Sequence, residues 1–341
     1  MFGLTKKRVL FGVAAGLVLV TTAACSSSGG AQKDSTAAAA SGSETASGGG
    51  TVADTPNYTF AMISHAPAGD TFFDVIQKGA TDAAAKDNVT FKYSGSGSVP
   101  EQANLIQNAI DSKVDGIAVS MPDPAALTEP IKKAVEAGIP VVIYNAGDRD
   151  WQKTGALSFF GEPEVLAGEF AGTKLNEIGS KHTLCVTQAQ GQIQLEDRCD
   201  GITSKFSGTT DRLFSDGTDP AGYVSTIQAK LASDPTIDSV VTLGPQLGVA
   251  LSNALKDAGS TVKVATYAFN ADAVPLLQSG QLAFTIDQQP WLQGYMAIDS
   301  LWQYKKNNSV LGAQLSTPTG PVVYDKDNIG SIVPFINEGL R

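Results

Sequence analysis

Cysteine and histidine are scarce in this sequence, which limits the chemistry available to it. The 341 residues include three cysteines and two histidines. Neither His65 nor His182 stands in a convincing constellation of metal ligands. The sequence therefore predicts no metal site and no cofactor.

Motifs for phosphate binding and nucleophilic catalysis are also missing. The glycine-rich stretch 94–98 (SGSGS) lacks the later glycines and the Lys-Ser/Thr pair of a P-loop, so we interpret it as a strand-to-helix loop. No GxSxG elbow occurs. Ser64 and His65 are neighbours at a predicted strand end, where successive side chains point in opposite directions. Nothing in the sequence requires catalysis, and we expect a protein that is not an enzyme.

Positive charge is in deficit as well, because the formal net charge is −10. An acidic chain without a basic stripe is a poor partner for a phosphate backbone. We therefore expect no nucleic-acid ligand.

The N-terminal segment has the pattern of a targeting sequence. A basic start, MFGLTKKR, precedes the apolar stretch 9–20, which is too short for a comfortable membrane span. The small residues before Cys25 resemble a bacterial lipobox, in which the cysteine becomes the lipidated first residue. The alternative is an ordinary secretory signal that is cleaved nearby.

Serine, alanine and glycine dominate the segment that follows, and such a composition cannot build a core. We predict a signal peptide over 1–24, then a lipidated Cys25 and a flexible tether over 25–56. The expected location is extracytoplasmic, on the outer face of the cytoplasmic membrane.

Two cysteines remain if Cys25 carries lipid. Cys185 and Cys199 flank a predicted strand end, loop and helix start, and an oxidising compartment favours their pairing. A disulfide is the prediction, with two separate buried thiols as the alternative.

Beyond residue 56, short apolar β-type runs alternate with amphipathic helical patterns. The strands are expected at 58–64, 89–94, 116–121, 139–145, 156–161 and 182–187, near 211–215, 238–243 and 262–267, and at 283–286. The helices are expected at 72–86, 101–113, 124–138, 164–179 and 290–304, and near 194–206, 221–233 and 246–258. This alternation predicts an α/β fold of two doubly wound parallel-sheet units in tandem.

Polar and aromatic side chains gather at or after the carboxyl ends of the predicted strands, where open α/β sheets bind ligands. The candidate binding residues are Ser64, His65, Asp70, Phe72, Phe73, Asn145, Arg198, Gly244, Asp287, Gln288 and Trp291. Singly, each polar residue could be a turn or cap residue, the aromatic ones could be core, and His65 could be a loop residue on the rim. Together they indicate one pocket between the two units.

The chemistry of these residues suits a hydroxyl-rich ligand. Carboxylate, amide and guanidinium groups can each span two neighbouring hydroxyls, and aromatic faces can cover the C–H face of a ring. An aromatic face could equally cover a polyol chain.

From Tyr58 onward the chain resembles the ribose-binding-protein-like type I solute-binding proteins of bacterial sugar ABC transporters. The most specific stretches are ISHAPAGDTFFDVIQKGA, CVTQAQGQIQLEDRCDGI, VVTLGPQLGVAL and TIDQQPWLQGYMAIDSLW. The resemblance implies two lobes joined by three crossing segments, with a ligand in the cleft and an ABC permease as partner. It places 57–161 and 289–317 in the N-terminal lobe, and 162–288 and 318–341 in the C-terminal lobe. We expect a monomer.

The resemblance also implies residue roles. Asp70 falls where the first loop presents an acceptor to sugar hydroxyls, with Phe72 and Phe73 as the paired aromatics. Asn145 corresponds to the polar residue that ends a strand of the first lobe. Arg198 and Gln288 correspond to the arginine of the second lobe and the glutamine of a hinge strand.

Three departures from the family pattern argue against ribose. Ala268 stands where many relatives carry a hydroxyl-gripping Asp, Gly244-Pro245 replaces Asn-Asp, and Ala146 replaces an Arg. The expected function is therefore capture of another sugar, a polyol or a cyclitol for import. The alternatives are a sensory subunit that presents ligand to a receptor kinase, and an extracytoplasmic enzyme on the same scaffold.

Overall fold

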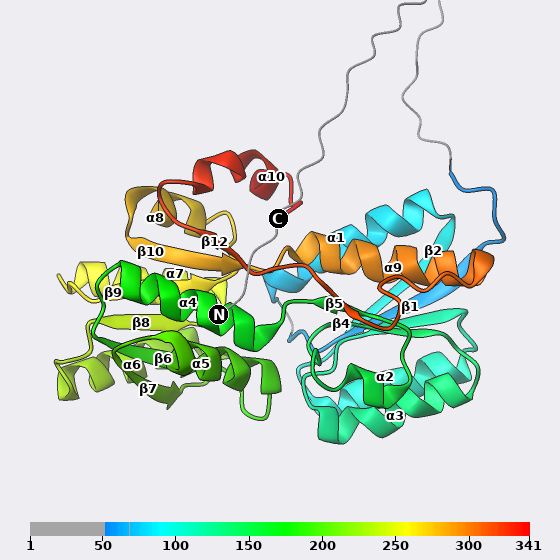
Figure 1. Ribbon diagram of the computed structural model, residues 1–341, viewed down its shortest axis with the longest axis horizontal. Coiled ribbons are helices and arrows are strands. Elements are labelled where there is room, and N and C mark those ends of the chain that lie inside the picture. Colours follow the sequence, from blue (N-terminus) through cyan, green and yellow to red (C-terminus); the bar gives the residue numbers. More distant parts are fainter. Residues whose placement is uncertain (1–51, 68) are drawn as a thin grey trace, which may run out of the picture. The chain divides into compact units, whose positions relative to one another are not determined.

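The computed structural model describes residues 52–67 and 69–341 (Figure 1). The predicted signal peptide, Cys25 and nearly all of the predicted tether lie outside these residues. Within the described ranges, every helix is too short or too polar to cross a membrane.

Two six-stranded sheets organise the described chain. The first has the spatial order β2-β1-β3-β4-β5-β11. Its strands are β1 (Tyr58–Ser64), β2 (Val89–Gly95), β3 (Gly116–Val119), β4 (Val141–Asn145), β5 (Phe159–Gly161) and β11 (Ser316–Pro318). Its helices are α1 (Thr71–Lys86), α2 (Val99–Asp111), α3 (Pro124–Glu136), α9 (Pro290–Asn307) and the 3-10 turn η1 (Trp151–Thr154). This sheet with its helices is the first lobe.

The second sheet repeats that order as β7-β6-β8-β9-β10-β12. Its strands are β6 (His182–Thr187), β7 (Thr209–Phe214), β8 (Ser239–Thr242), β9 (Lys263–Tyr267), β10 (Leu282–Asp287) and β12 (Val322–Tyr324). Its helices are α4 (Glu164–Glu177), α5 (Ile193–Lys205), α6 (Pro220–Ser233), α7 (Pro245–Asp257), α8 (Ala273–Ser279), the turn η2 (Ile329–Ser331) and α10 (Val333–Asn337). This sheet with its helices is the second lobe, and the two-lobed doubly wound fold is confirmed.

The chain crosses between the lobes three times, after β5, after β10 and after β11. Sequence reasoning predicted parallel sheets, but β12 pairs antiparallel with β10 at the edge of the second sheet. The reason is the third crossing. β11 runs parallel to β5, toward the crossings, and the chain then enters the second sheet travelling away from them.

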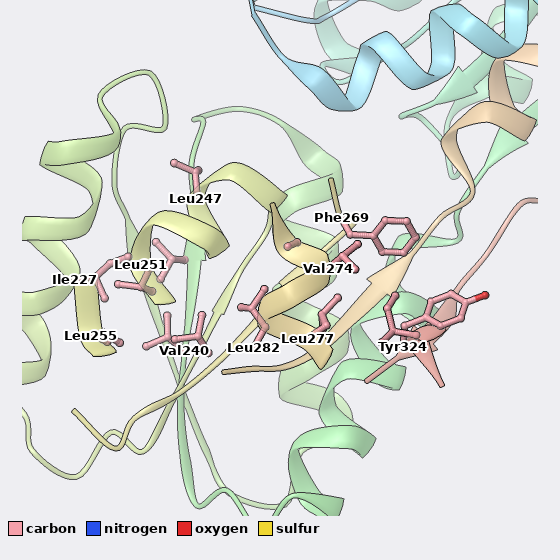
Figure 2. Packing of buried hydrophobic residues seen from close by; sticks show 14 of the residues in the cluster. Ile227, Val240, Leu247, Leu251, Leu255, Phe269, Val274, Leu277, Leu282 and Tyr324 are labelled. Carbon is pink, nitrogen blue, oxygen red and sulfur yellow. The ribbon is translucent and has the colours of Figure 1, made fainter. Parts of the chain in front are cut away.

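Strands that are apolar on both faces build the cores. In β1, Phe60 and Met62 pack under α1 and α9, whereas Ala61 and Ile63 pack against α2 and α3. This period-two division is what a sheet covered on both faces requires. Figure 2 shows one of the two cores of the second lobe, where Val240 of β8 lies among residues of α7 and α8.

Aspartates begin several of the helices. The carboxylates of Asp70, Asp123 and Asp219 accept hydrogen bonds from Phe72 N, Ala126 N and Gly222 N at the starts of α1, α3 and α6. Each side chain satisfies a backbone donor that has no partner within the helix. The predicted helices accordingly begin within about two residues of their observed starts.

The predicted disulfide joins Cys185 of β6 to Cys199 of α5, with Cα atoms 5.9 Å apart. It closes the segment 186–198, which contains the loop and helix start that border the cavity described below. In the chain-entropy model a link across a loop of this length stabilises the fold by roughly 3 kcal/mol.

Candidate functional site

A cavity of about 400 Å³ lies between the carboxyl ends of strands from both lobes. We call it the interlobe cavity, and its size is within the range typical of small-molecule sites. Eight of the eleven candidate residues line it, namely His65, Asp70, Phe72, Phe73, Asn145, Arg198, Gly244 and Gln288. The remaining lining residues are Pro67, Gly69, Gln188, Ala189, Gln192, Gln194, Leu195, Gly217, Thr218, Pro220, Leu243, Pro245, Gln246, Leu247 and Ala268.

Arg198 is the buried cation of the cavity wall. Glu164 binds it in a fork, with Nε donating to Oε2 at 2.5 Å and Nη2 to Oε1 at 3.1 Å. The guanidinium lies over the ring of Tyr267, 4.6 Å from its centre. Two carboxylate bonds and a stacked aromatic face hold the group in one orientation, with its far edge toward the cavity.

The close approach of α4 and α5 brings this pair together. A Cβ on Gly168 would stand 2.2 Å from the carbonyl oxygen of Arg198, and one on Gly201 would stand 2.1 Å from that of Val165. Only glycine allows two helix backbones this near to each other. Glu164, at the start of α4, thereby reaches Arg198 in the middle of α5.

Amide side chains form the floor of the cavity at the second crossing. Asn145 Nδ2 donates to Gln288 Oε1 at 3.0 Å and to Gln293 Oε1 at 3.1 Å. Gln293 Nε2 in turn donates to the Gln288 carbonyl and to Thr319 Oγ1, both at 3.1 Å. This network ties the end of β4 to two of the three crossings, so the floor is rigid and uncharged.

Asp70 and the adjacent aromatic residues form the first-lobe wall. Asp70 caps α1, and burial raises the pKa of its carboxyl. Phe72 and Phe73 meet edge to face at 5.3 Å, and the His65 ring meets Phe73 at 4.9 Å. Phe73 also belongs to the core, so it supports the wall from behind while Phe72 is the more exposed ring.

His65 is a buried residue of the wall rather than a loop residue on the rim. Its Nδ1 lies 2.9 Å from Ser120 Oγ, and its Nε2 lies 3.3 Å from Gln194 of the opposite lobe. Burial, aided by the charge of Arg198, lowers its pKa to about 3, so the ring is neutral at physiological pH.

Three candidate residues lie outside the cavity lining. The Ser64 hydroxyl bonds to Tyr93 at 2.8 Å, on the side of β1 away from His65. The Asp287 carboxylate accepts from Gln289 N at 2.9 Å and faces Arg341 at 3.6 Å. In each case the next residue along the strand lines the cavity, because neighbours alternate between the two faces.

Trp291, in the first turn of α9, is half-buried and lies against α1. Its indole N–H donates to Asp82 of α1 at 2.9 Å, and its ring stacks on Tyr295 at 4.7 Å. These contacts give it a packing role between α1 and α9.

Sequence reasoning missed several glutamines of the second-lobe wall. Gln188, Gln192 and Gln194 all lie in the loop and helix start after β6, and their position after the carboxyl end of that strand was the available signal. Gln246, in the first turn of α7, also lines the cavity, as expected of the polar strand end 244–246. With Asn145 and Gln288 they make an amide-rich lining.

Direct contacts connect the lobes across the mouth of the cavity. Gln246 Nε2 donates to Thr71 Oγ1 at 2.6 Å, and Ile193 N donates to the Pro122 carbonyl at 3.0 Å. Arg149, which follows β4, forms an ion pair with Asp197 of α5. The lobes thus touch along one side of the site.

One acidic cluster outside the cavity has the geometry of metal ligands: His182, Asp211 and Asp234. The Lys230 ammonium lies among them, 2.9 Å from Asp211 Oδ2 and 3.5 Å from Asp234 Oδ2. The lysine ammonium thus already contacts both carboxylates.

Comparison with known proteins identifies the family. Residues 60–309 match the periplasmic binding protein domain. The chain is 25% identical over 300 residues to the xylose/arabinose-binding protein XylF of Sulfolobus acidocaldarius. The aligned region covers 82% of this chain and 74% of that protein. It is 21% identical to the ribose import binding protein RbsB of Bacillus subtilis, over 75% of this chain and 86% of that protein.

A solved structure of a carbohydrate transporter from Acidothermus cellulolyticus 11B, in complex with myo-inositol, is more similar. It shares 49% sequence identity and a TM-score of 0.82, covering 84% of this chain and all of that one. These relatives are binding proteins of sugar transport and not enzymes. The chain belongs to the periplasmic binding protein family, with the type I fold.

Proposed function

We propose that this protein captures a cyclitol, with myo-inositol as the leading candidate, outside the cell and delivers it to an ABC permease. The observation that carries the proposal is the 49% identity to a chain solved with myo-inositol. The cavity lining supports it: six amide side chains and one oriented arginine suit a ring that carries hydroxyls on every carbon.

The proposal includes the lobe boundaries, the lipid anchor at Cys25 and the monomeric state expected from sequence. Binding residues in both lobes would be bridged by one ligand, which stabilises the closed form. A tether from Cys25 would keep the protein near its permease.

Isothermal titration of the purified protein tests the ligand. We expect myo-inositol to bind more tightly than ribose, xylose, arabinose or glucose. Tighter binding of any of these aldoses, or no binding of any cyclitol, would contradict the proposal.

Asp70→Asn tests whether the site is the interlobe cavity. Asparagine can still cap α1, but it replaces a charged acceptor by a neutral one. Charge-assisted hydrogen bonds exceed neutral ones by about 1 kcal/mol, so affinity for myo-inositol is expected to fall about fivefold to tenfold.

Asp123→Asn is the matched control, because Asp123 caps α3 in the same way and does not line the cavity. Its affinity should equal that of the parent protein. Equal effects of the two substitutions would place the ligand elsewhere.

A further inference from the structure

The charge of Arg198 is balanced inside the protein before any ligand arrives. The Glu164 carboxylate accepts one hydrogen bond from Arg198 Nε and one from Arg198 Nη2. The Leu243 carbonyl is 3.5 Å from Nη1. Of the five N–H groups of an arginine, two are then left without a hydrogen bond to any residue that the structure describes, and Arg198 lines the cavity. The arginine can donate to two neighbouring hydroxyls while contributing little net positive charge.

A second carboxyl, that of Glu162, stands behind the same arginine. Its Oε2 lies 3.8 Å from Arg198 Nη2, and neither of its oxygens forms a hydrogen bond with any residue that the structure describes. Burial, reinforced by the charge of Glu164, raises the pKa of Glu162 well above its usual range. Burial also raises the pKa of Glu164 to about 7, although Arg198 opposes the shift. Glu164, which bonds directly to the guanidinium, is therefore the carboxyl of the two whose charge Arg198 stabilises more.

The remaining titratable groups of the described lining add no positive charge. His65 is neutral, and Asp70 contributes an acceptor that is negative when ionised. The cavity as a whole is therefore neutral or slightly negative. An anion that entered it would lose its hydration without gaining an unpaired cation.

We propose that Glu164 is a specificity-determining positioning residue that orients and neutralises Arg198, so that the cavity accepts uncharged polyols and rejects anionic ones. This inference rests on the proposed function and goes one step further, to the class of hydroxylated ligand that is excluded. Acids of similar ring shape, such as cyclitol carboxylates, are the excluded class.

Glu164→Gln tests the inference, because it keeps the shape of the side chain and removes its charge. Affinities for myo-inositol and for quinate, a cyclitol carboxylate, are measured by titration at pH 8. The parent protein should prefer myo-inositol by about 100-fold or more, because burial of an anion without a partner is strongly unfavourable. In Glu164→Gln the unbalanced arginine should lower that preference about tenfold or more.

Two further variants separate charge from packing. Glu164→Asp keeps the charge but shortens the reach, so it should weaken myo-inositol binding and still reject quinate. Glu196→Gln is the matched control: Glu196 also pairs with an arginine, Arg212 at 3.2 Å, but on the surface of the second lobe. It should leave both affinities unchanged.

The outcomes distinguish this inference from the proposed function. If the parent protein binds quinate as well as myo-inositol, the inference fails and the proposed function stands. If Glu164→Gln weakens both ligands equally, Glu164 has only a structural role and the inference also fails. If the parent protein prefers another neutral polyol, that polyol replaces myo-inositol as the proposed ligand, and its preference over the matching acid tests the inference. Should Glu164→Gln not fold, the parent protein and Glu164→Asp still decide, since both must reject the acid.

Discussion

A single buried carboxyl at the second crossing, Asp287, links the stability of the protein to pH. Only its Oδ1 accepts a hydrogen bond, from Gln289 N, and Oδ2 has no hydrogen-bond partner among the described residues. Burial raises its pKa from 3.8 to about 6, against the opposing charge of Arg341. Between pH 3.8 and about 6, Asp287 is therefore protonated in the folded state and ionised in the unfolded state.

The sign of the pH effect follows from this raised pKa. The contribution of the raised Asp287 pKa to the free energy of unfolding is fully present below pH 4. It is lost as pH rises through about 6. Asp287→Asn removes the titration, so its free energy of unfolding relative to the parent should rise by up to about 3 kcal/mol between pH 4 and pH 8. Urea unfolding at several pH values measures the difference.

Asp325→Asn provides a control of opposite sign. Lys174 lowers the pKa of Asp325, so this carboxylate stabilises the fold at neutral pH and loses its effect in acid. A difference between Asp287→Asn and the parent that did not change with pH would show that folding does not raise the pKa of Asp287.

At the scale of elements, the α4–α5 crossing determines where Arg198 stands. The crossing depends on Gly168 and Gly201, whose absent side chains let the two backbones meet. The surrounding atoms are main-chain atoms that cannot move aside easily. A methyl group at either position must therefore push the helices apart.

Gly201→Ala is expected to destabilise the fold by about 1–3 kcal/mol, because it overpacks a helix crossing. It should also weaken ligand binding, since a shifted α5 moves Arg198 away from Glu164. Gly330→Ala is the matched control, because a Cβ there meets nothing within 4 Å. Thermal unfolding and titration of both variants measure the two effects. A Gly201→Ala protein with normal stability would mean that the helices are not in close contact.

Most strands and helices could be predicted because their patterns are local. The apolar runs of β1 and β4 and the amphipathic repeat of α1 need no knowledge of the rest of the chain. The elements that were missed (β11, β12, α8 and α10) are short, and their structure depends on partners distant in sequence. Ser316–Pro318 becomes a strand only because β5 lies beside it.

Most of the candidate residues at the strand ends line the cavity, but the direction of the side chains could not always be predicted. The carboxyl ends of the strands pointed to His65 and Gln288, yet their neighbours Ser64 and Asp287 were included with them. Which of two adjacent residues faces the cavity depends on strand register and on the crossings. The contact of Glu164 with Arg198 could not be predicted either, since a carboxylate at a helix start has a sufficient local explanation in the helix dipole.

On the scale of the whole molecule, contacts join the two lobes beside the cavity and would favour the closed form that the proposed function requires. The ion pair of Arg149 and Asp197 is one of them, and it joins the loop after β4 to α5. The Asp197 side chain is buried, and burial raises its pKa to about 6. Opening the lobes returns both groups to water, so the pair contributes to the balance between open and closed forms.

Arg149→Ala should shift that balance toward the open form, because it leaves a buried carboxylate without its partner in the closed one. The Arg149 side chain is 53% exposed, so we expect a modest effect of about 1 kcal/mol. If the closed form is no longer dominant without ligand, the apparent affinity for ligand falls by up to about fivefold. Small-angle scattering without ligand should show a larger radius of gyration than that of the parent protein, and saturating ligand should return it to the parent value.

Lys153→Ala is the control, since Lys153 pairs with Asp150 within the first lobe. An unchanged radius and affinity in Arg149→Ala would show that the ligand alone, and not this ion pair, keeps the lobes together.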